Sequence, residues 1–309
     1  IRLDKLNKIF RTRHRDIHAL SDVDLTVGQG EFVSLVGPSG CGKSTILRML
    51  ANIVRPTSGR ISINGVELSS RSRWPESLIR SPGLVFQAPT RLPWLTVREN
   101  IALPLRVFRM RDAGLEARLD DLLGRFGLED HAGAYPAELS GGMAQKAGVL
   151  RALVHDPDIL LMDEPFGALD PITRDSLQQL IKRLQKELGK TVVFVTHDMD
   201  EALALADRIV IMDKGRVVQF DAPENILQNP ANPFVESLLG EDRLNEARLA
   251  LRTVDEIMVR DPALVTSGKS IRDALRLMRR RRAETLFVTD PDGVIQGVVD
   301  IFDIEKVSV

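Results

Sequence analysis

A run of nine residues, from Gly37 to Thr45, has the composition of a loop that binds phosphate. Apolar residues 32–36 before it predict a buried strand, and residues 46–50 after it predict a helix. In this context the pattern Gly-x-x-x-x-Gly-Lys-Ser lets successive backbone N–H groups face one anion, and the helix adds the positive end of its dipole. We expect Lys43 to reach the β- and γ-phosphates of a nucleoside triphosphate and Ser44 to hold Mg²⁺. The phosphate-binding residues would be Gly37, Pro38, Ser39, Gly40, Cys41, Gly42, Lys43, Ser44 and Thr45.

Two adjacent carboxylates, Asp163 and Glu164, follow a second apolar stretch, residues 158–162. Two carboxylates at the end of a buried strand are costly unless they serve a cation. We expect Asp163 to bind Mg²⁺ and Glu164 to polarise the water that attacks the γ-phosphate.

Gln87 and His197 lie at the ends of two further apolar stretches, residues 84–88 and 191–195. Parallel strands place their carboxyl ends at one edge of a sheet, where α/β proteins bind ligands. His197 is therefore predicted to lie at the same edge as the phosphate loop and Asp163.

A second candidate anion site is Ser140-Gly141-Gly142, at the start of a helix predicted over residues 144–155. Free N–H groups at a helix N-terminus bind anions. In the first strands Phe10 could stack on a nucleobase, or it could be a structural residue.

Each of these positions also has a plain structural interpretation. Residues 37–45 could form a glycine-rich turn with a lysine by chance, and Cys41 could be a tolerated small residue or a nucleophile. Asp163-Glu164 could be an acidic surface turn, and Ser140 could simply begin a helix.

The remaining pattern and the composition predict a protein of two domains. The chain has 309 residues, 43% of them hydrophobic, which exceeds one ordinary core. Strands are predicted in residues 1–36, with a hairpin at Asn64-Gly65, and helices in residues 112–128 and 173–188.

Lys and Arg number 42 against 43 acidic residues, so no global field favours nucleic acid. One cysteine, no apolar run near ~18 residues and no signal peptide predict a cytosolic protein.

Together, these motifs resemble the ATP-binding subunit of ABC transporters over residues 1–240. The resemblance implies an α/β fold, with a RecA-like P-loop core, an antiparallel β subdomain and a helical subdomain over about residues 89–155. The matching motifs are Walker A (Gly37–Thr45), the Q-loop (Gln87), the signature (Leu139–Met143), Walker B (Ile159–Asp163 with Glu164), the D-loop (Ala168–Asp170), the switch histidine (His197) and the aromatic A-loop position (Phe10).

The resemblance further implies that two chains enclose two ATP molecules head to tail. Ser140, Gly141 and Gly142 of one chain would meet the γ-phosphate held by the other, with Asp170 also in the binding site. Glu164, His197 and Gln87 would be catalytic, and Gln87 would join Ser44 and Asp163 at Mg²⁺. Residues 87–97 would contact separate permease subunits at the cytoplasmic face of the membrane, and an external substrate-binding protein would take part indirectly.

Two residues depart from the family pattern, and the second of them, Lys146, predicts reduced rather than absent activity. Met143 replaces the signature Gln, and Lys146 stands where Arg is usual, which turns a bidentate contact into a point contact. Residues 166–174 and 196–202 resemble ATPases of glycine betaine, carnitine and choline importers, whereas residues 92–97 resemble the nitrate, sulfonate and taurine group. The sequence also leaves open a non-transport ABC ATPase and a catalytically silent nucleotide binder.

After a predicted linker, residues 241–253, the last 56 residues (254–309) resemble a single CBS domain with a β-α-β-β pattern. CBS modules normally pair, so either a second copy is missing or the module pairs with its copy in a dimer. Asp303 matches the Ser/Thr-x-x-Asp ending that holds adenosine and Asp300 does not, which argues against nucleotide binding there. The run Arg279–Arg282 could be a solvated helix end or a sensor of anionic lipid or ionic strength.

Overall fold

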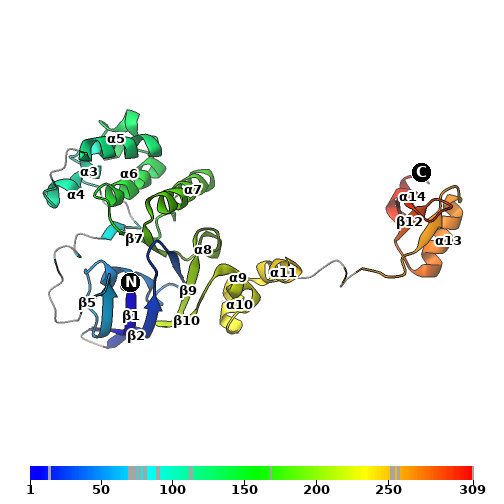
Figure 1. The fold of residues 1–309 in the computed structure, drawn as a ribbon, viewed down its shortest axis with the longest axis horizontal. Helices are drawn as coiled ribbons and strands as arrows, with labels where there is room; N and C mark the ends of the chain where they lie inside the picture. The colour runs from blue at the N-terminus through cyan, green and yellow to red at the C-terminus, as the bar shows by residue number, and fades with distance from the viewer. Residues whose placement is uncertain are drawn as a thin grey trace. The chain divides into compact units, whose positions relative to one another are not determined.

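The computed structural model describes residues 1–12, 15–68, 75, 78, 82–87, 91–110, 114–167, 169–250, 255 and 258–307. The chain divides into two compact units, Ile1–Arg248 and Leu249–Val309 (Figure 1). No helix in the described part of the chain has the length and apolar composition needed to cross a membrane.

A six-stranded sheet forms the centre of the first unit. Its order is β10-β9-β3-β8-β7-β6, and all neighbours are parallel except β9 and β10. Every residue of β3 and β8 is buried, as expected for parallel strands covered on both faces. The strands are β3 (Phe32–Val36), β6 (Pro82–Val85), β7 (Ile159–Asp163), β8 (Thr191–Val195), β9 (Arg208–Asp213) and β10 (Arg216–Asp221).

A four-stranded antiparallel sheet of order β2-β1-β4-β5 lies beside it, formed by β1 (Arg2–Arg11), β2 (Asp16–Thr26), β4 (Ser58–Ile63) and β5 (Val66–Leu68). Helix α1 (Lys43–Leu50) joins both sheets, because its Ile46 belongs to one core cluster with Leu6 of β1 and Leu35 of β3. The predicted Asn64-Gly65 hairpin is confirmed: both residues have positive φ, and Ile63 pairs with Val66.

The helices α3 (Val97–Ile101), α4 (Leu103–Val107), α5 (Leu115–Phe126) and α6 (Gly141–Leu153) gather at one end of this unit (Figure 1). Helix α3 begins with a capping box formed by Thr96 and Glu99. Helix α6 lies directly on β6, because a Cβ on Gly83 would be 2.2 Å from the carbonyl oxygen of Ala152. Helix α6, which begins within the signature, and strand β6, which precedes Gln87, are thus packed against each other.

Five helices complete the first unit: α7 (Pro171–Leu188), α8 (Met199–Leu205), α9 (Pro223–Gln228), α10 (Pro233–Leu239) and α11 (Glu241–Ala250). Leu244 of α11 is buried in the main hydrophobic core. The first turns of the predicted linker therefore pack within the first unit, because Leu244 gives α11 an apolar contact there.

In its described residues, the second unit contains a three-stranded sheet, β11-β12-β13, and helices α13 and α14. Its elements are β11 (Leu264–Thr266), α13 (Ile271–Arg281), β12 (Thr285–Thr289), β13 (Ile295–Asp300) and α14 (Ile301–Val307). Met278, Leu286 and Ile304 are the centre of its core. The β-α-β-β pattern is present, and the sequence pattern missed α14, which follows it.

Candidate nucleotide-binding site

Four adjacent strands end where the predicted site residues begin. In the order β3-β8-β7-β6, the strands run parallel and lead into the phosphate loop, His197, Glu164 and Gln87. The sheet topology therefore brings together segments that are far apart in the sequence.

The phosphate loop closes around the ammonium group of Lys43, which is 5% exposed. Lys43 Nζ donates to the carbonyl oxygens of Gly37 at 2.6 Å and Pro38 at 3.0 Å. Gly42, the N-cap of α1, has φ 110°, and a Cβ there would lie 2.6 Å from the carbonyl oxygen of Ala19. Only glycine fits at this point, where the loop touches β2.

Cys41 is buried inside the loop, and its Sγ lies 3.8 Å from Lys43 Nζ. Burial raises the pKa of the Cys41 thiol, although the neighbouring ammonium opposes the shift. The thiol is therefore neutral at pH 7, which agrees with a small tolerated residue and disfavours a nucleophile.

Ser44, at the start of α1, contacts Asp163, at the end of β7. Ser44 Oγ donates to Asp163 Oδ1 at 2.9 Å. A hydroxyl and a carboxylate oxygen are ligands that suit Mg²⁺. Among the described residues, no group of three or more His, Cys, Asp and Glu side chains could hold a metal ion. This sparse donor set fits Mg²⁺, which uses one or two carboxylates and takes its other ligands from phosphate and water.

The three predicted catalytic residues meet at one carboxylate oxygen. Glu164 Oε2 accepts from Gln87 Nε2 at 3.0 Å and lies 3.2 Å from His197 Nδ1. The Glu164 side chain is 22% exposed and the His197 side chain 63% exposed, so the histidine lies on the solvent side of the carboxylate. Glu164 also has φ 47°, which is strained for a residue other than glycine.

A buried polar cluster behind His197 was not predicted from the sequence. Thr196 Oγ1 donates to Glu201 Oε2 at 2.6 Å, and burial raises the pKa of Glu201. Asp198 caps α8, and its Oδ2 lies 3.8 Å from Arg174 Nη1. The available sequence signal was the Asp198 N-cap directly before a helix.

The signature residues and Asp170 lie apart from the phosphate loop. Ser140 is the N-cap of α6, where its Oγ accepts from the Met143 N–H at 3.3 Å. Asp170 caps α7 by accepting from the Thr173 N–H at 3.1 Å, which lowers its pKa. Within the described ranges, no hydrogen bond joins Ser140, Gly141, Gly142 or Asp170 to residues 37–45. Ala168 of the predicted D-loop lies outside the described residues.

Phe10 lies on β1, where it pairs with Ile17 of β2. Both side chains are about two-fifths exposed, at 38% and 41%, and Lys8 Nζ lies 4.8 Å from the Phe10 ring centroid. The ring face is therefore partly covered by a cation.

One buried side chain, Asn100, holds Leu92 and Leu95 of the predicted permease-contact segment. Asn100 accepts from the Leu92 N–H at 2.8 Å and donates to the carbonyls of Leu92 and Leu95 at 3.0 and 2.9 Å. Trp94 remains 69% exposed. Residues 88–90 of this segment lie outside the described residues. Lys146 donates to the Phe126 carbonyl at 3.1 Å, so its point contact is with the end of α5.

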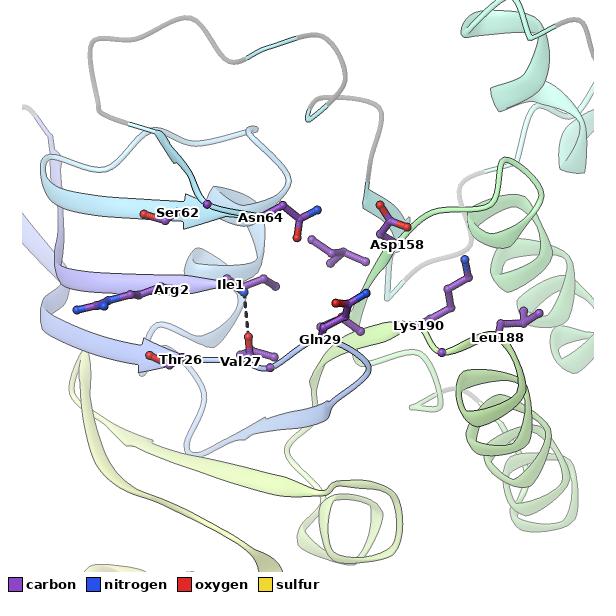
Figure 2. Close-up of a pocket in the computed structure, with 15 residues that line it drawn as sticks. Ile1, Arg2, Thr26, Val27, Gln29, Ser62, Asn64, Asp158, Leu188 and Lys190 are labelled. Atoms are coloured by element: carbon purple, nitrogen blue, oxygen red, sulfur yellow. Dashed lines mark hydrogen bonds between the residues drawn. The ribbon is translucent and has the colours of Figure 1, made fainter.

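A cavity of about 740 Å³ lies at the opposite, amino-terminal ends of the strands (Figure 2). Gln29, Asn64, Asp158 and Lys190 surround it, between the two sheets. None of the predicted site residues lines this cavity, so it is separate from the nucleotide-binding site.

The fold and this set of side chains define an ATP-binding cassette. The family model described as ABC transporter matches residues 20–167, and the CBS domain model matches residues 254–309. A solved dimeric cassette, MJ0796 in a post-hydrolysis state with ADP and Pi, is 37% identical with a TM-score of 0.65 and covers 72% of this chain and 98% of its own.

Two curated relatives match nearly the whole chain. The carnitine transport ATP-binding protein OpuCA of Listeria monocytogenes is 46% identical over 97% of this chain and 76% of that protein. The glycine betaine/carnitine/choline transport ATP-binding protein OpuCA of Bacillus subtilis is 42% identical over 99% of this chain and 80% of that protein. The chain belongs to the ABC transporter family, as an ATPase cassette followed by a CBS domain. The predicted resemblance and fold class are confirmed.

Proposed function

We propose that this chain is the ATP-hydrolysing subunit of an ABC importer. The observation that carries the proposal is the convergence of Lys43, the Ser44–Asp163 pair and the Glu164 cluster at the ends of four adjacent strands. This convergence supports a single site for the phosphates of a nucleoside triphosphate.

In this proposal each side chain has a defined task. Lys43 would bind the β- and γ-phosphates, and Ser44, Asp163 and Gln87 would hold Mg²⁺, which would supply positive charge to neutralise the phosphate oxygens. Glu164 polarises the attacking water, and His197 contacts the γ-phosphate and keeps the water in line with Glu164. Phe10 stacks on the base.

The site is completed by a second copy of the chain. Ser140 caps α6, whose first residues are Gly141 and Gly142, and their backbone N–H groups would bind the γ-phosphate held by the other copy; Asp170 lies at a second helix start. Dimeric solved cassettes support this arrangement. ATP would thus join two subunits, and its hydrolysis would release them.

A quaternary-amine osmoprotectant is the proposed transported substrate, because the curated relatives carry names of carnitine, glycine betaine and choline transport proteins. The exposed segment around Trp94 would dock on permease subunits at the cytoplasmic face of the membrane, with a substrate-binding protein on the other side. The nitrate, sulfonate and taurine class is the second candidate, based on residues 92–97.

The catalytic proposal is tested with Glu164→Gln. Removal of the general base should lower phosphate release at least about 100-fold, and the variant should form a dimer with ATP and Mg²⁺ that size-exclusion chromatography detects. Glu67→Gln, on exposed β5, is the matched control. Hydrolysis by Glu164→Gln at the rate of this control would refute the assignment.

The substrate proposal needs an uptake measurement. Cells that lack this chain should lose uptake of labelled glycine betaine, carnitine or choline and keep uptake of taurine and nitrate. Loss of taurine or nitrate uptake instead would select the second class.

A further inference from the structure

Arg243, in the first turn of α11, joins three helices through its guanidinium group. Its Nε and Nη2 donate to the two carboxylate oxygens of Asp200 at 2.7 and 2.6 Å, and its Nη1 donates to the Leu239 carbonyl at 2.6 Å. This bidentate geometry fixes orientation as well as distance. Arg243 belongs to none of the motifs that the sequence identified.

Asp200 lies in the first turn of α8, which begins directly after His197. The Asp200 N–H donates to Asp198 Oδ1 at 2.8 Å, and Asp198 is the N-cap that follows His197 in the chain. His197 Nδ1 in turn lies 3.2 Å from Glu164 Oε2. The Arg243–Asp200 and Asp200–Asp198 hydrogen bonds, the peptide bond between Asp198 and His197, and the His197–Glu164 contact therefore connect Arg243 to the catalytic carboxylate.

The first turn of α8 carries three carboxylates: Asp198, Asp200 and Glu201. Arg174 forms ion pairs with two of them: its Nη1 lies 3.8 Å from Asp198 Oδ2, and its Nε lies 4.0 Å from Glu201 Oε1. In the described part of the chain, Arg243 is the only ion-pair partner of Asp200. Loss of this cation would leave Asp200 to repel its neighbours in the turn that holds His197.

Helix α11 has few other contacts with the first unit. Leu244 is buried, whereas Asn245 and Glu246 are exposed and Leu249 is 64% exposed. Arg243 and Leu244 thus attach the start of α11, and its other end continues into the second unit, which begins at Leu249.

We propose that Arg243 is a positioning residue for ATP hydrolysis: it holds Asp200, and through α8 it fixes His197 beside Glu164. The inference rests on the proposed roles of His197 and Glu164.

Steady-state ATP hydrolysis by Arg243→Gln, Asp200→Asn and the double variant tests this role. Arg243→Gln should lower kcat about three- to tenfold and leave KM for ATP within about twofold, because the phosphate loop is untouched. The double variant should be no slower than Arg243→Gln, since both changes break one pair. Arg243→Lys keeps the positive charge but loses the bidentate contact of the guanidinium group with Asp200, so its kcat should be intermediate. Arg2→Gln, which breaks the exposed Arg2–Asp4 pair, is the control.

Hydrogen exchange of the amides in residues 196–201 gives a readout that does not depend on hydrolysis. Exchange should be faster in Arg243→Gln than in Arg2→Gln, at equal thermal stability. The inference is overturned if kcat and exchange in Arg243→Gln equal those of Arg2→Gln, or if KM alone rises. If the unmodified chain itself fails to hydrolyse ATP, the proposed function falls, and the exchange measurement alone decides whether Arg243 holds His197 in place.

Discussion

Glu164 has a left-handed backbone, with φ 47°, at the turn after β7. Its N–H donates to the Val195 carbonyl at 2.9 Å, so the turn is held to the neighbouring strand β8. Such a conformation costs a residue with a side chain about 1 kcal/mol or more. The strained position directs the carboxylate at Gln87 and His197, as is common at functional sites.

This strain predicts different stabilities for two variants that both lack the carboxylate. Glu164→Gly should be about 1 kcal/mol more stable than Glu164→Ala, because only alanine keeps the steric cost of the left-handed backbone. At Glu67, within strand β5, the order should reverse, since glycine weakens an ordinary strand. Urea unfolding of the four variants measures both differences, and equal stabilities at residue 164 would contradict the strain.

The residue types at the strand ends were predictable, but their contacts were not. Lys43, Ser44 and Asp163 follow from composition and spacing beside apolar stretches. The bond between Gln87 and Glu164 joins residues 77 positions apart, and it depends on the pairing of β6 with β7 and on side-chain rotamers. The buried Thr196–Glu201 pair likewise depends on the path of α8.

At the level of elements, runs of five apolar residues predicted their strands, whereas the sequence pattern predicted neither the short strand β11 nor helix α14. Strands β3 and β8 have the predicted bounds, Phe32–Val36 and Thr191–Val195. Strand β11 has three residues, Leu264–Thr266, too few to show an alternating pattern. Helix α14 was missed because the residues at its start, 300–303, were interpreted only as a candidate adenosine-binding segment.

An ion-pair triad links the helical part of the first unit to its sheet. Asp156 Oδ1, after α6, lies 2.6 Å from Arg118 Nη2 of α5 and 2.8 Å from Lys190 Nζ, before β8. The bond from Arg118, followed by that from Lys190, lowers the pKa of Asp156 to about 2. The triad therefore fixes α5 relative to two turns of the core.

This triad predicts a pH-dependent contribution to stability. Because the folded pKa is below the unfolded value near 3.8, the stabilisation is full at neutral pH and is lost as the pH falls from about 4 to about 2. Its size should be about 1 kcal/mol, since the Asp156 side chain is 53% exposed and screened by solvent.

Urea midpoints measure this dependence. The difference between the unmodified chain and Asp156→Asn should be larger at pH 7 than at pH 3. Asp130→Asn, at an exposed residue, is the control. An Asp156→Asn effect of equal size at both pH values would contradict the triad's role.

At the level of the molecule, the phosphate loop and the signature helix start are separate within one chain. Both carry backbone N–H groups suited to one anion, yet within the described residues no hydrogen bond joins them. In the proposed dimer, two copies form each complete site, and each copy supplies the part that the other needs.

Mixed dimers test this division. Lys43→Ala damages one half of each site, and Gly141→Glu damages the other half by placing a carboxylate at the anion-binding helix start. Each variant alone should be inactive, whereas a mixture should recover about a quarter of the original rate: random pairing makes half of the dimers mixed, with one of two sites intact. Separately purified variants are the baseline, and a mixture no faster than this baseline would contradict shared sites.

The contacts of Lys43 have a consequence for which nucleotides the loop prefers. The carbonyl oxygens of Gly37 and Pro38 accept hydrogen bonds from its ammonium group, as the oxygens of a crown ether do from an ammonium ion. In the proposed site, nucleotide binding would replace these two carbonyl oxygens by phosphate oxygens as the hydrogen-bond acceptors of Lys43. A monophosphate offers nothing at the β and γ positions in return. In this proposal, the preference for triphosphates over monophosphates arises because Lys43 must break its hydrogen bonds to Gly37 and Pro38 when a nucleotide binds.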